Sequence, residues 1–399
     1  MLSAARLFCL AQIVSASLTV PDLAQIIDQA SFNFLPTVTP TDLTNDSLVF
    51  QPPGVPEADL AAKPFHIYDE EFLSILGDNP TLTLIAESAS NPLYHEAVVW
   101  NPPTDEVFFV QSAGGTGSGT GLNKSAIIQK ISVPQAAAVS HLRNASGLVN
   151  VTVVPSTPTV INPNGGTYYK GNLLYVTEGQ GKSVPPALYL MNPQAPYNTT
   201  IILNNYFNRQ FNSLNDIAVH PVNGEIYFTD SLYGYLQDFR PAPTIRNQVY
   251  RFNPKTGAVS VVADGFDLPN GLVFSPDGRY AYVTDTGDKQ GLRGTDSLAP
   301  ATIYRYNVQG DGTLENRKVF AFAGSGHPDG IHCDSKGNVW SGCGDGVNVW
   351  SPAGKLLGKI YMGGFRTANF QFAGKGCLII TAETRLYYAT LSASGTRLT

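Results

Sequence analysis

The hydrophobic and polar positions of the chain repeat in a unit of two short apolar runs separated by a polar turn. In the segment 215–230, the apolar run 217–219 is followed by Pro221-Val222-Asn223-Gly224 and then by a second apolar run, 226–228. Two apolar runs of strand length around a turn of this composition indicate an antiparallel β-hairpin. The unit begins with Asn215 and Asp216, two polar residues that a hairpin alone does not require.

The same unit recurs along the chain. Further copies occupy residues 96–110, 165–177, 270–285, 329–340 and 368–381, which gives six copies at spacings of roughly 40 to 70 residues. Strand-rich repeats of about 40–50 residues, with about four strands in each, are typical of β-propellers. The chain is therefore predicted to be all-β, a six-bladed β-propeller; a β-sandwich whose hairpins resemble one another by chance is the alternative.

The segments between the copies supply the remaining strands. Residues 247–252, 258–262 and 302–308 have the composition of outer strands, and 65–68 and 81–86 precede the first copy. One of these two early segments is expected to complete the last blade and close the ring, because an open propeller would expose sheet edges.

The N-terminal region has a different pattern. Residues 1–16 contain Arg6, an apolar run over 7–14 and the small-residue sequence Val14-Ser15-Ala16, which together indicate a secretory signal peptide. Residues 17–65 are predicted to wrap the outside of the propeller, with one short helix over 23–30, and residues 66–399 to form the catalytic propeller domain. The protein is thus expected to be secreted.

Sequons and cysteines fit this location. Glycosylation sites are predicted at Asn45, Asn123, Asn144, Asn150 and Asn198. Removal of a signal that contains Cys9 leaves Cys333, Cys343 and Cys377, an odd number that permits at most one disulfide. The sequence does not select a pair.

Composition and charge exclude two classes of partner. Charged residues make up 14% of the chain, and 38 Gly and 28 Pro suit an all-β protein rich in turns. A net charge of −6 without a Lys/Arg cluster argues against nucleic acid. Beyond the signal, no apolar run approaches the ~20 residues of a membrane span. The glycine-rich loop 113–121 lacks the pattern of a phosphate loop, and it and the long loop 286–300 are predicted to be surface loops, although long loops in propellers often shape pockets.

Four copies open with an oxygen-bearing side chain in the same position: Glu96, Asn215, Asn270 and Asp329. If the first strand of each copy is innermost, these side chains meet at one mouth of the central channel. Two carboxylates and two amides form an oxygen set that suits a hard divalent cation such as Ca²⁺, whereas zinc would favour clustered His and Cys. At any single position, capping of a strand start is the alternative.

Histidines lie close to these positions in the sequence. His95 precedes Glu96, His327 stands two residues before Asp329, and His332 stands three after it. Strand alternation places His332 out of phase with Asp329, so it is expected to point away from the channel. Asp216 could bind a second ion or orient Asn215, while Asp230 and Asp285 are predicted to cap turns. No G-x-S-x-G motif is present, which removes the usual serine-hydrolase mechanism.

Four motifs in this order resemble the regucalcin/gluconolactonase family, and within it the secreted fungal lactonohydrolases. They are Glu-Ala-x-x-Trp at 96–100, Asn-Asp-Ile at 215–217, Asn-Gly-Leu-x-Phe-x-Pro-Asp-Gly at 270–278 and Pro-Asp-Gly-Ile at 328–331. Tyr-His-Glu-Ala-Val-Val-Trp at 94–100 and Ala-Asn-Phe-Gln-Phe at 368–372 are close to the fungal subgroup. The sequence at 215–216 is also similar to that of paraoxonases.

The resemblance implies a calcium-dependent lactonase that opens small hydroxylated lactones such as aldono-1,4-lactones and D-pantoyl lactone. It marks Glu96, Asn270 and Asp329 as metal ligands, Asn215 as a ligand of metal or substrate, and Asn369 as a substrate contact. Asp329 is the implied general base, with His327 and His95 as alternatives, because a metal-bound carboxylate is a weakened base.

Two departures from the family pattern limit what carries over. His95 stands where animal members have Gly, and Ala97 replaces a paired acidic residue of paraoxonases, which puts a second Ca²⁺ in doubt. Two other functions remain alternatives, a non-catalytic binding propeller and a strictosidine-synthase-like condensing enzyme of the same fold.

Overall fold

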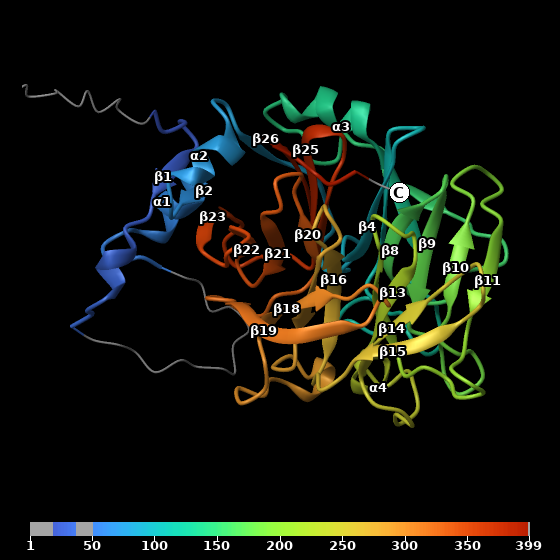
Figure 1. Cartoon of the computed structure of the whole chain (residues 1–399). Coiled ribbons are helices and arrows are strands. Elements are labelled where there is room, and N and C mark those ends of the chain that lie inside the picture. Colours follow the sequence, from blue (N-terminus) through green and yellow to red (C-terminus); the bar gives the residue numbers. More distant parts are fainter. Residues whose placement is uncertain (1–18, 37–50, 398–399) are drawn as a thin grey trace, which may run out of the picture.

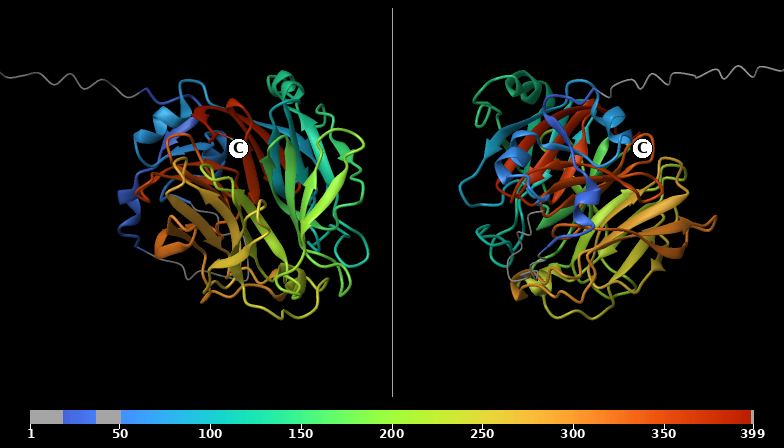
Figure 2. Two further views of the ribbon diagram at one scale, coloured as in Figure 1. Left: turned by 45° about the vertical axis from the view of Figure 1, so that its right-hand side comes forward. Right: turned by 90° about the vertical axis from the view of Figure 1, so that its left-hand side faces the viewer.

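A computed structural model describes residues 19–36 and 51–397. Its strands form six sheets arranged around a central axis, five of them four-stranded and one six-stranded (Figures 1 and 2). The innermost strands of neighbouring sheets contact one another around the whole ring, from β4 through β8, β12, β16, β20 and β24 back to β4. The prediction of a six-bladed β-propeller is confirmed.

The strands lie at the following bounds: β1 Ala24–Ile26, β2 Phe65–Ile67, β3 Thr81–Glu87, β4 Glu96–Asn101, β5 Glu106–Val110, β6 Ile128–Ser132, β7 Thr152–Val154, β8 Pro163–Tyr169, β9 Asn172–Thr177, β10 Leu188–Met191, β11 Thr199–Leu203, β12 Leu214–Val219, β13 Ile226–Asp230, β14 Gln248–Phe252, β15 Val259–Ala263, β16 Pro269–Phe274, β17 Tyr280–Asp285, β18 Thr302–Val308, β19 Leu314–Phe322, β20 Ile331–Cys333, β21 Val339–Cys343, β22 Gly346–Trp350, β23 Leu356–Tyr361, β24 Asn369–Phe372, β25 Lys375–Ala382 and β26 Arg385–Ser394. The helices are short: η1 Gln29–Phe32, α1 Glu57–Ala62, α2 Glu71–Leu76, α3 Val133–Ser140, α4 Tyr233–Leu236 and η2 Gly291–Arg293.

Each blade is an antiparallel meander whose first strand lies nearest the axis, and the predicted hairpins form the first two strands of every blade. The ring closes through β3, which pairs with β26 as the outer strand of the last blade. Of the two early segments considered for this role, 81–86 therefore completes the ring. The first and last parts of the chain thus share one sheet. Its middle strands, β25 and β26, each have a hydrogen-bonded neighbour on both sides.

The segment before β3 extends a different blade. Strand β2 pairs with β23, and β1 pairs in parallel with β2, so the fifth blade has six strands. The predicted helix over 23–30 is wrong: residues 24–26 form a strand and residues 29–32 a single 3₁₀ turn. Pairing with the free edge of β2 satisfies the backbone of this segment, which overrides the helical spacing of its apolar residues.

The hydrophobic core lies between adjacent blades. Trp340 of one blade packs against Phe372 of the next. On another interface Phe228 stacks on Tyr250, and Phe211 meets both rings edge-on. Cys333, Cys343 and Cys377 are buried free thiols, so the structure contains none of the possible disulfides among them.

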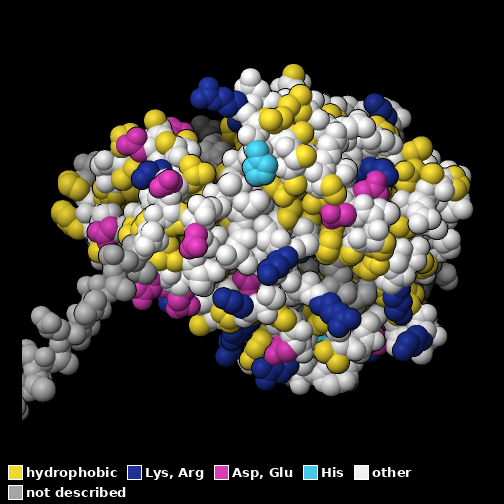
Figure 3. Space-filling view, turned by 90° about the horizontal axis from the view of Figure 1, so that it is seen from above, with side chains coloured by type: hydrophobic (Ala, Val, Ile, Leu, Met, Phe, Trp, Pro, Cys, Tyr) yellow, Lys and Arg dark blue, Asp and Glu magenta, His cyan; other side chains and the backbone are white. Residues whose placement is uncertain are grey.

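Surface features bear on the predicted location of the protein. The predicted signal peptide and Asn45 lie outside the described residues, whereas Asn123, Asn144, Asn150 and Asn198 are all exposed. No helix among the described residues is long and apolar enough to cross a membrane. On the face seen in Figure 3, acidic and basic side chains are interspersed, and hydrophobic side chains occur in scattered groups.

Candidate functional site

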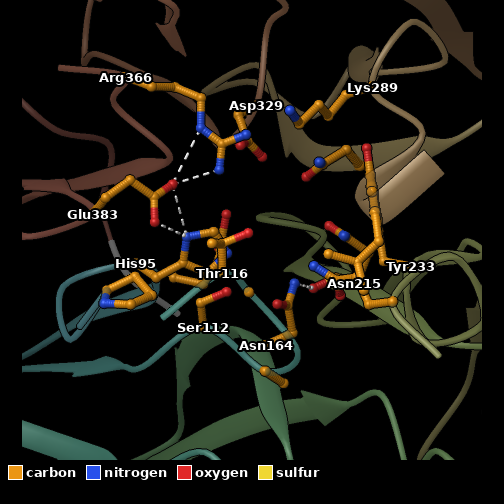
Figure 4. A pocket seen from close by; sticks show the side chains of 18 of the residues that line it. His95, Ser112, Thr116, Asn164, Asn215, Tyr233, Lys289, Asp329, Arg366 and Glu383 are labelled. Carbon is orange, nitrogen blue, oxygen red and sulfur yellow. Dashed lines mark hydrogen bonds and ion pairs between the residues drawn. The ribbon is translucent and has the colours of Figure 1, made fainter. Parts of the chain in front are cut away.

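Four side chains predicted to converge line one pocket at a mouth of the central channel. Glu96 opens β4, Asn215 and Asn270 are the second residues of β12 and β16, and Asp329 lies just before β20. All four line a cavity of about 410 Å³ (Figure 4). Each is at least nine-tenths buried, with exposed fractions of 3% to 5%. We refer to these four residues as the axial ring.

Glycines after the ring positions permit this convergence. A Cβ atom on Gly271 would lie 2.5 Å from the backbone oxygen of Asp329, and one on Gly330 would lie 2.5 Å from the Cγ atom of Asn369. Real Cβ atoms do not approach so closely, so the residue after the ring position must be glycine where the next blade's inner strand comes this near. The Asn-Gly and Asp-Gly pairs in the repeats are therefore packing requirements as well as turn signals.

A β-bulge at the start of β4 orients the Glu96 side chain. The pairing of β4 with β5 shifts between Glu96 and Val99, and the inner strands β8, β12 and β16 shift at the matching place. Ala97 has a φ of 47°, a left-handed conformation that costs a non-glycine residue about 1 kcal/mol or more. The bulge turns the opening residue of the strand toward the axis while the rest of the strand stays in the sheet.

The axial ring holds two acidic side chains close together in a buried site. Burial raises the pKa of Glu96 well above its ordinary value, and the nearby charges of Asp329 and Asp216 raise it further. Glu96 Oε2 accepts hydrogen bonds from Asn369 Nδ2 at 2.6 Å and from the backbone N–H of Ala97 at 3.1 Å. These bonds only partly offset the cost of two acidic groups held close together in a buried site.

Two amide oxygens of the ring have no partner among the described residues. Asn215 Oδ1 and Asn270 Oδ1 are buried and accept no hydrogen bond there, although such groups are normally paired. The amide nitrogen of Asn270 donates to Thr286 Oγ1 at 3.3 Å, which leaves the oxygen as the free end of that side chain.

The ring therefore fits a hard divalent cation. Two carboxyl groups held close together and two orphaned amide oxygens form the oxygen donor set that Ca²⁺ takes, with further ligands left to water or substrate. The described residues contain no group of three or more His, Cys, Asp or Glu side chains that could hold a metal, so a softer ion such as zinc lacks its usual ligands there.

A second set of side chains lies at one wall of the pocket, which its members His95, Arg366 and Glu383 line. Glu383, in the turn between β25 and β26, receives His95 Nδ1 at 3.0 Å on Oε2 and Arg366 Nε at 3.1 Å on Oε1. Arg366 Nη2 also donates to Glu383 Oε1. Arg366 Nη1 contacts His327 Nε2 at 3.1 Å, and His327 Nδ1 lies 3.5 Å from Asp288 Oδ1. Figure 4 shows Glu383 between Arg366 and His95 at the pocket edge. We call these five residues the polar wall.

Electrostatics in the polar wall are balanced, unlike those in the axial ring. Burial alone would raise the pKa of Glu383, but His95 and Arg366 lower it well below its ordinary value. Burial likewise opposes the charge on Arg366, and Glu383 and Asp329 more than offset this and raise its pKa. Glu383 is therefore a carboxylate and Arg366 a cation at neutral pH.

Donor and acceptor rules separate the two candidate histidines. A guanidinium can only donate, so the Nε2 atom that faces Arg366 is an acceptor and His327 carries its proton on Nδ1. Its lone pair is therefore already used, and His327 is not among the residues that line the pocket. His95 does line the pocket, and its Nε2 has no hydrogen-bond partner within the described part of the chain.

Three residues singled out in the sequence lie on the other side of the ring. Asn369, Asp216 and His332 line a second cavity of about 740 Å³ between the inner strands. Asn369 Nδ2 donates a hydrogen bond to Glu96 Oε2. Unlike the four residues of the axial ring, Asn369 does not line the first pocket. His332 Nε2 is 3.4 Å from Asn369 Oδ1, so the expectation from strict alternation that His332 points away from the channel is wrong.

Backbone groups satisfy the remaining aspartates that the sequence marks as candidates. Asp216 accepts from the N–H groups of Ile217 and Leu272, and thus ties its blade to the next one. Asp230 accepts from the N–H groups of Asn212 and Ser213, and Asp285 from those of Asp267 and Leu268. The last two therefore hold the segments that lead into β12 and β16, and not the hairpin turns that they were predicted to cap.

Sequence reasoning missed several residues of the pocket. Asn164 lines it and donates from Nδ2 to the backbone oxygen of Asn215 at 2.9 Å. Pro163-Asn164-Gly165 matches Pro269-Asn270-Gly271, so beginning the weak copy one residue earlier would have revealed it. Glu178, Arg366 and Glu383 also line the pocket. They lie outside the ring positions of the repeats and gave no comparable signal.

Comparison with known proteins places the chain. Residues 135–384 match the family described as SMP-30/Gluconolactonase/LRE-like region. The chain belongs to this family. It is 31% identical over 322 residues to lactonohydrolase oryL of Aspergillus oryzae, which covers 75% of this chain and 67% of that protein. Lactonohydrolase oryH of the same organism is 25% identical over 384 residues, covering 78% and 76%.

A solved gluconolactonase from Xanthomonas campestris superposes with a TM-score of 0.62 at 26% identity, covering 82% of this chain and 94% of that one. In this member of the SMP-30/gluconolactonase family, two long loops close the sides of the pocket. Ala113, Gly115 and Thr116 come from one, and Lys289, Gly291 and Leu292 from the other. Both loops, predicted simply as surface loops, thus border the pocket.

Proposed function

We propose that this protein hydrolyses small hydroxylated lactones to hydroxy acids with the help of one bound Ca²⁺. The observation that carries the proposal is the pair of buried amide oxygens, unpartnered among the described residues, beside two mutually destabilising carboxylates. A bound cation would complete such a ring, and family membership with lactonohydrolase and gluconolactonase relatives supplies the reaction class.

The ring residues Glu96, Asn215, Asn270 and Asp329 would hold the ion. When bound, Ca²⁺ would act as a Lewis acid toward the carbonyl group of an ester. The polar side chains around it suit a substrate with several hydroxyl groups: Ser112, Thr116 and Asn164 lie along the same pocket (Figure 4). A cavity of about 410 Å³ admits a five- or six-membered lactone and excludes large esters.

Hydrolysis also needs a base. Water adds to the carbonyl carbon and gives up a proton, the ring C–O bond breaks, and the departing alkoxide takes a proton back. Asp329 remains the first candidate for this base, as the family implies. His95 is the alternative, because its Nε2 is free of contacts with the described residues and belongs to the pocket lining. His327 is the weakest of the three, since its Nε2 lone pair accepts from Arg366.

The proposal includes secretion and glycosylation. It is supported by the sequence of residues 1–16 and by the exposure of the four described sequon asparagines. Secretion would bring the ring into contact with millimolar calcium, where even a weak site of about 10⁻⁴ M is filled. Intact-mass measurement of the secreted protein before and after glycosidase treatment tests this part.

The decisive experiment is an assay of acid release from a panel of aldono-1,4-lactones and both enantiomers of pantoyl lactone. Each substrate is tested with added Ca²⁺, with a chelator, and with Ca²⁺ restored. We expect hydrolysis of at least one hydroxylated lactone that stops on chelation and returns with Ca²⁺. Activity that survives complete removal of Ca²⁺ would overturn the metal assignment, and failure to open any lactone would overturn the reaction class.

A further inference from the structure

Glu383 stands at a junction that neither the ring nor the family motifs explain. It lies in the β25–β26 turn of the last blade, with a φ of 59°, a conformation that is strained for a residue with a side chain. From there its carboxylate reaches His95 at the start of the first blade and Arg366 in the loop before β24. The two-residue turn itself calls for a left-handed residue, and a glutamate at this position directs its carboxylate toward His95 and Arg366.

The hydrogen bonds determine where the proton of His95 resides. A carboxylate only accepts, so the His95 Nδ1 atom that faces Glu383 carries a hydrogen. Nε2, on the opposite side of the imidazole, then points away from Glu383, and none of the described residues pairs with it. The neighbouring backbone adds a further restraint, because Tyr94 N–H donates to the Glu383 carbonyl oxygen at 2.9 Å.

The same carboxylate orients Arg366. Its Nε and Nη2 both donate to Glu383 Oε1, and its Nη1 donates to His327, so three of five N–H groups are fixed. The guanidinium is thereby held flat against the pocket wall as part of its lining. A lysine in its place could not satisfy Glu383 and His327 together, because an ammonium is a point donor without the planar fork.

We infer that Glu383 is a positioning residue for the proposed hydrolysis: it fixes the His95 ring with Nε2 toward the pocket and locks Arg366 in the pocket wall. It acts through these two residues and does not touch the substrate. For its role in catalysis this inference rests on the proposed function with His95 as the base, the alternative to Asp329, but the orientation of His95 can be tested without any substrate.

Glutamine at position 383 is the informative substitution. Glu383→Gln keeps size and shape but offers one acceptor and one donor in place of two acceptors. If the Gln oxygen stays with Arg366, its NH₂ group faces His95, which can then accept only through an Nδ1 without hydrogen. The proton would move to Nε2, the atom that must accept in the pocket. Glu383→Asp is the second variant, because its carboxylate falls about 1.5 Å short of His95.

The test of orientation uses protein labelled with ¹⁵N-histidine, in which long-range ¹H–¹⁵N spectra report the state of both ring nitrogens; His95→Asn identifies the His95 signals. We expect E383Q and E383D to shift the ring-nitrogen signals of His95. The matched control is Glu87→Gln, whose carboxylate accepts from Arg385 at 2.8 Å in the same sheet and does not line the pocket. Unchanged His95 signals in folded E383Q or E383D would overturn the inference, whether or not the protein opens a lactone.

The kinetic test asks whether Glu383 acts through His95. We expect E383Q to lower kcat by about 10²-fold with KM changed by less than about threefold, because a misplaced base affects the reaction step more than binding. In a His95→Asn background, E383Q should lower kcat by no more than about threefold further. Losses that multiply, or a change confined to KM, would contradict the positioning role. E87Q should match the wild type in both constants.

Discussion

The axial ring and the polar wall face the same pocket, yet they differ in how completely their polar groups are paired. In the ring, Asn215 Oδ1 and Asn270 Oδ1 have no partner among the described residues, and the pKa of Glu96 is raised by burial and by Asp329. In the wall, Glu383 is paired on both oxygens, and its pKa is lowered by its neighbours despite burial.

The difference separates binding from positioning. Buried polar groups without partners destabilise a fold unless a ligand completes them, so the ring is the part of the pocket that the proposed ion would complete. Glu383, in contrast, is paired on both oxygens, so its geometry is set before a substrate arrives. Removal of a residue should therefore affect ion binding in the ring and the reaction step in the wall.

The largest effect is expected from the ring carboxylates. Glu96→Gln and Asp329→Asn each remove one of only two negative charges from the oxygen set, which weakens calcium binding and the stabilisation that the ion supplies. We predict a fall in kcat/KM of about 10³-fold or more for each, measured with saturating Ca²⁺, together with weaker calcium binding by calorimetry.

Substitutions of the two carboxylates test different assignments. D329N with near-normal kcat and intact calcium binding would end the assignment of Asp329 as the base, and would leave His95 as the candidate. E96Q tests the ring itself, because no role in proton transfer is proposed for Glu96. E87Q, outside the pocket, is the control for both.

The fold was predictable from the chain in a way that the wall was not. Hairpins at 215–230 and 270–285 carry local turn and strand signals, and six such copies specify the propeller. The axial ring could be predicted because its members occupy one repeated position. Asn164 was missed only because the weak copy was begun one residue late. The helix predicted over 23–30 is wrong because pairing with β2 is a long-range contact that local spacing does not encode.

The wall depends on contacts that no repeat specifies. Glu383 and His95 are 288 residues apart and meet only because β3 and β26 close the ring. Arg366 lies in a loop, three residues before the start of β24, with nothing in its surroundings to mark it. Residues that act through closure of a fold become visible only when the closure is known.

A second prediction concerns thermal stability. The effect of Glu96→Gln on the Tm should have opposite signs in chelator and in Ca²⁺. Calcium that binds only the folded ring adds about 2.7 kcal/mol of stability at a hundredfold excess over its Kd, so chelation should lower the Tm of the wild type. In chelator, however, E96Q should unfold at a higher temperature than the wild type, because it removes one of two repelling buried groups. In Ca²⁺ the order should reverse.

Thermal unfolding of both proteins in both buffers measures these four values. An E96Q protein that is less stable than the wild type in chelator as well as in Ca²⁺ would mean that Glu96 stabilises the fold without an ion. The comparison between an incomplete ring and a complete wall would then fail.

A smaller effect is expected at Asn164, which borders the ring without an unpartnered atom of its own. Asn164→Ala removes one amide from the pocket and its bond to the Asn215 backbone oxygen, a net change of about 1 kcal/mol. We predict a loss of about fivefold in kcat/KM, since about 1.4 kcal/mol is tenfold. Calcium affinity should change little, and a collapse of calcium binding in N164A would place Asn164 in the ring.

The smallest effect is the contribution of the wall to stability in acid. The folded pKa of Glu383 lies below its unfolded value of about 4.5 because His95 and Arg366 favour the carboxylate. A group of this kind stabilises the fold above its unfolded pKa, and the contribution is lost as pH falls toward the folded pKa. At about pH 6 the Tm of E383Q should therefore lie below that of the wild type, by a few degrees at most, and the two values should converge between about pH 4.5 and 3.

E87Q should show no such convergence, because its pair with Arg385 is partly exposed to solvent and contributes little. A gap between E383Q and the wild type that stays constant down to about pH 3 would mean that the charge of Glu383 is not what stabilises the wall, and that the carboxylate serves only to orient its two partners.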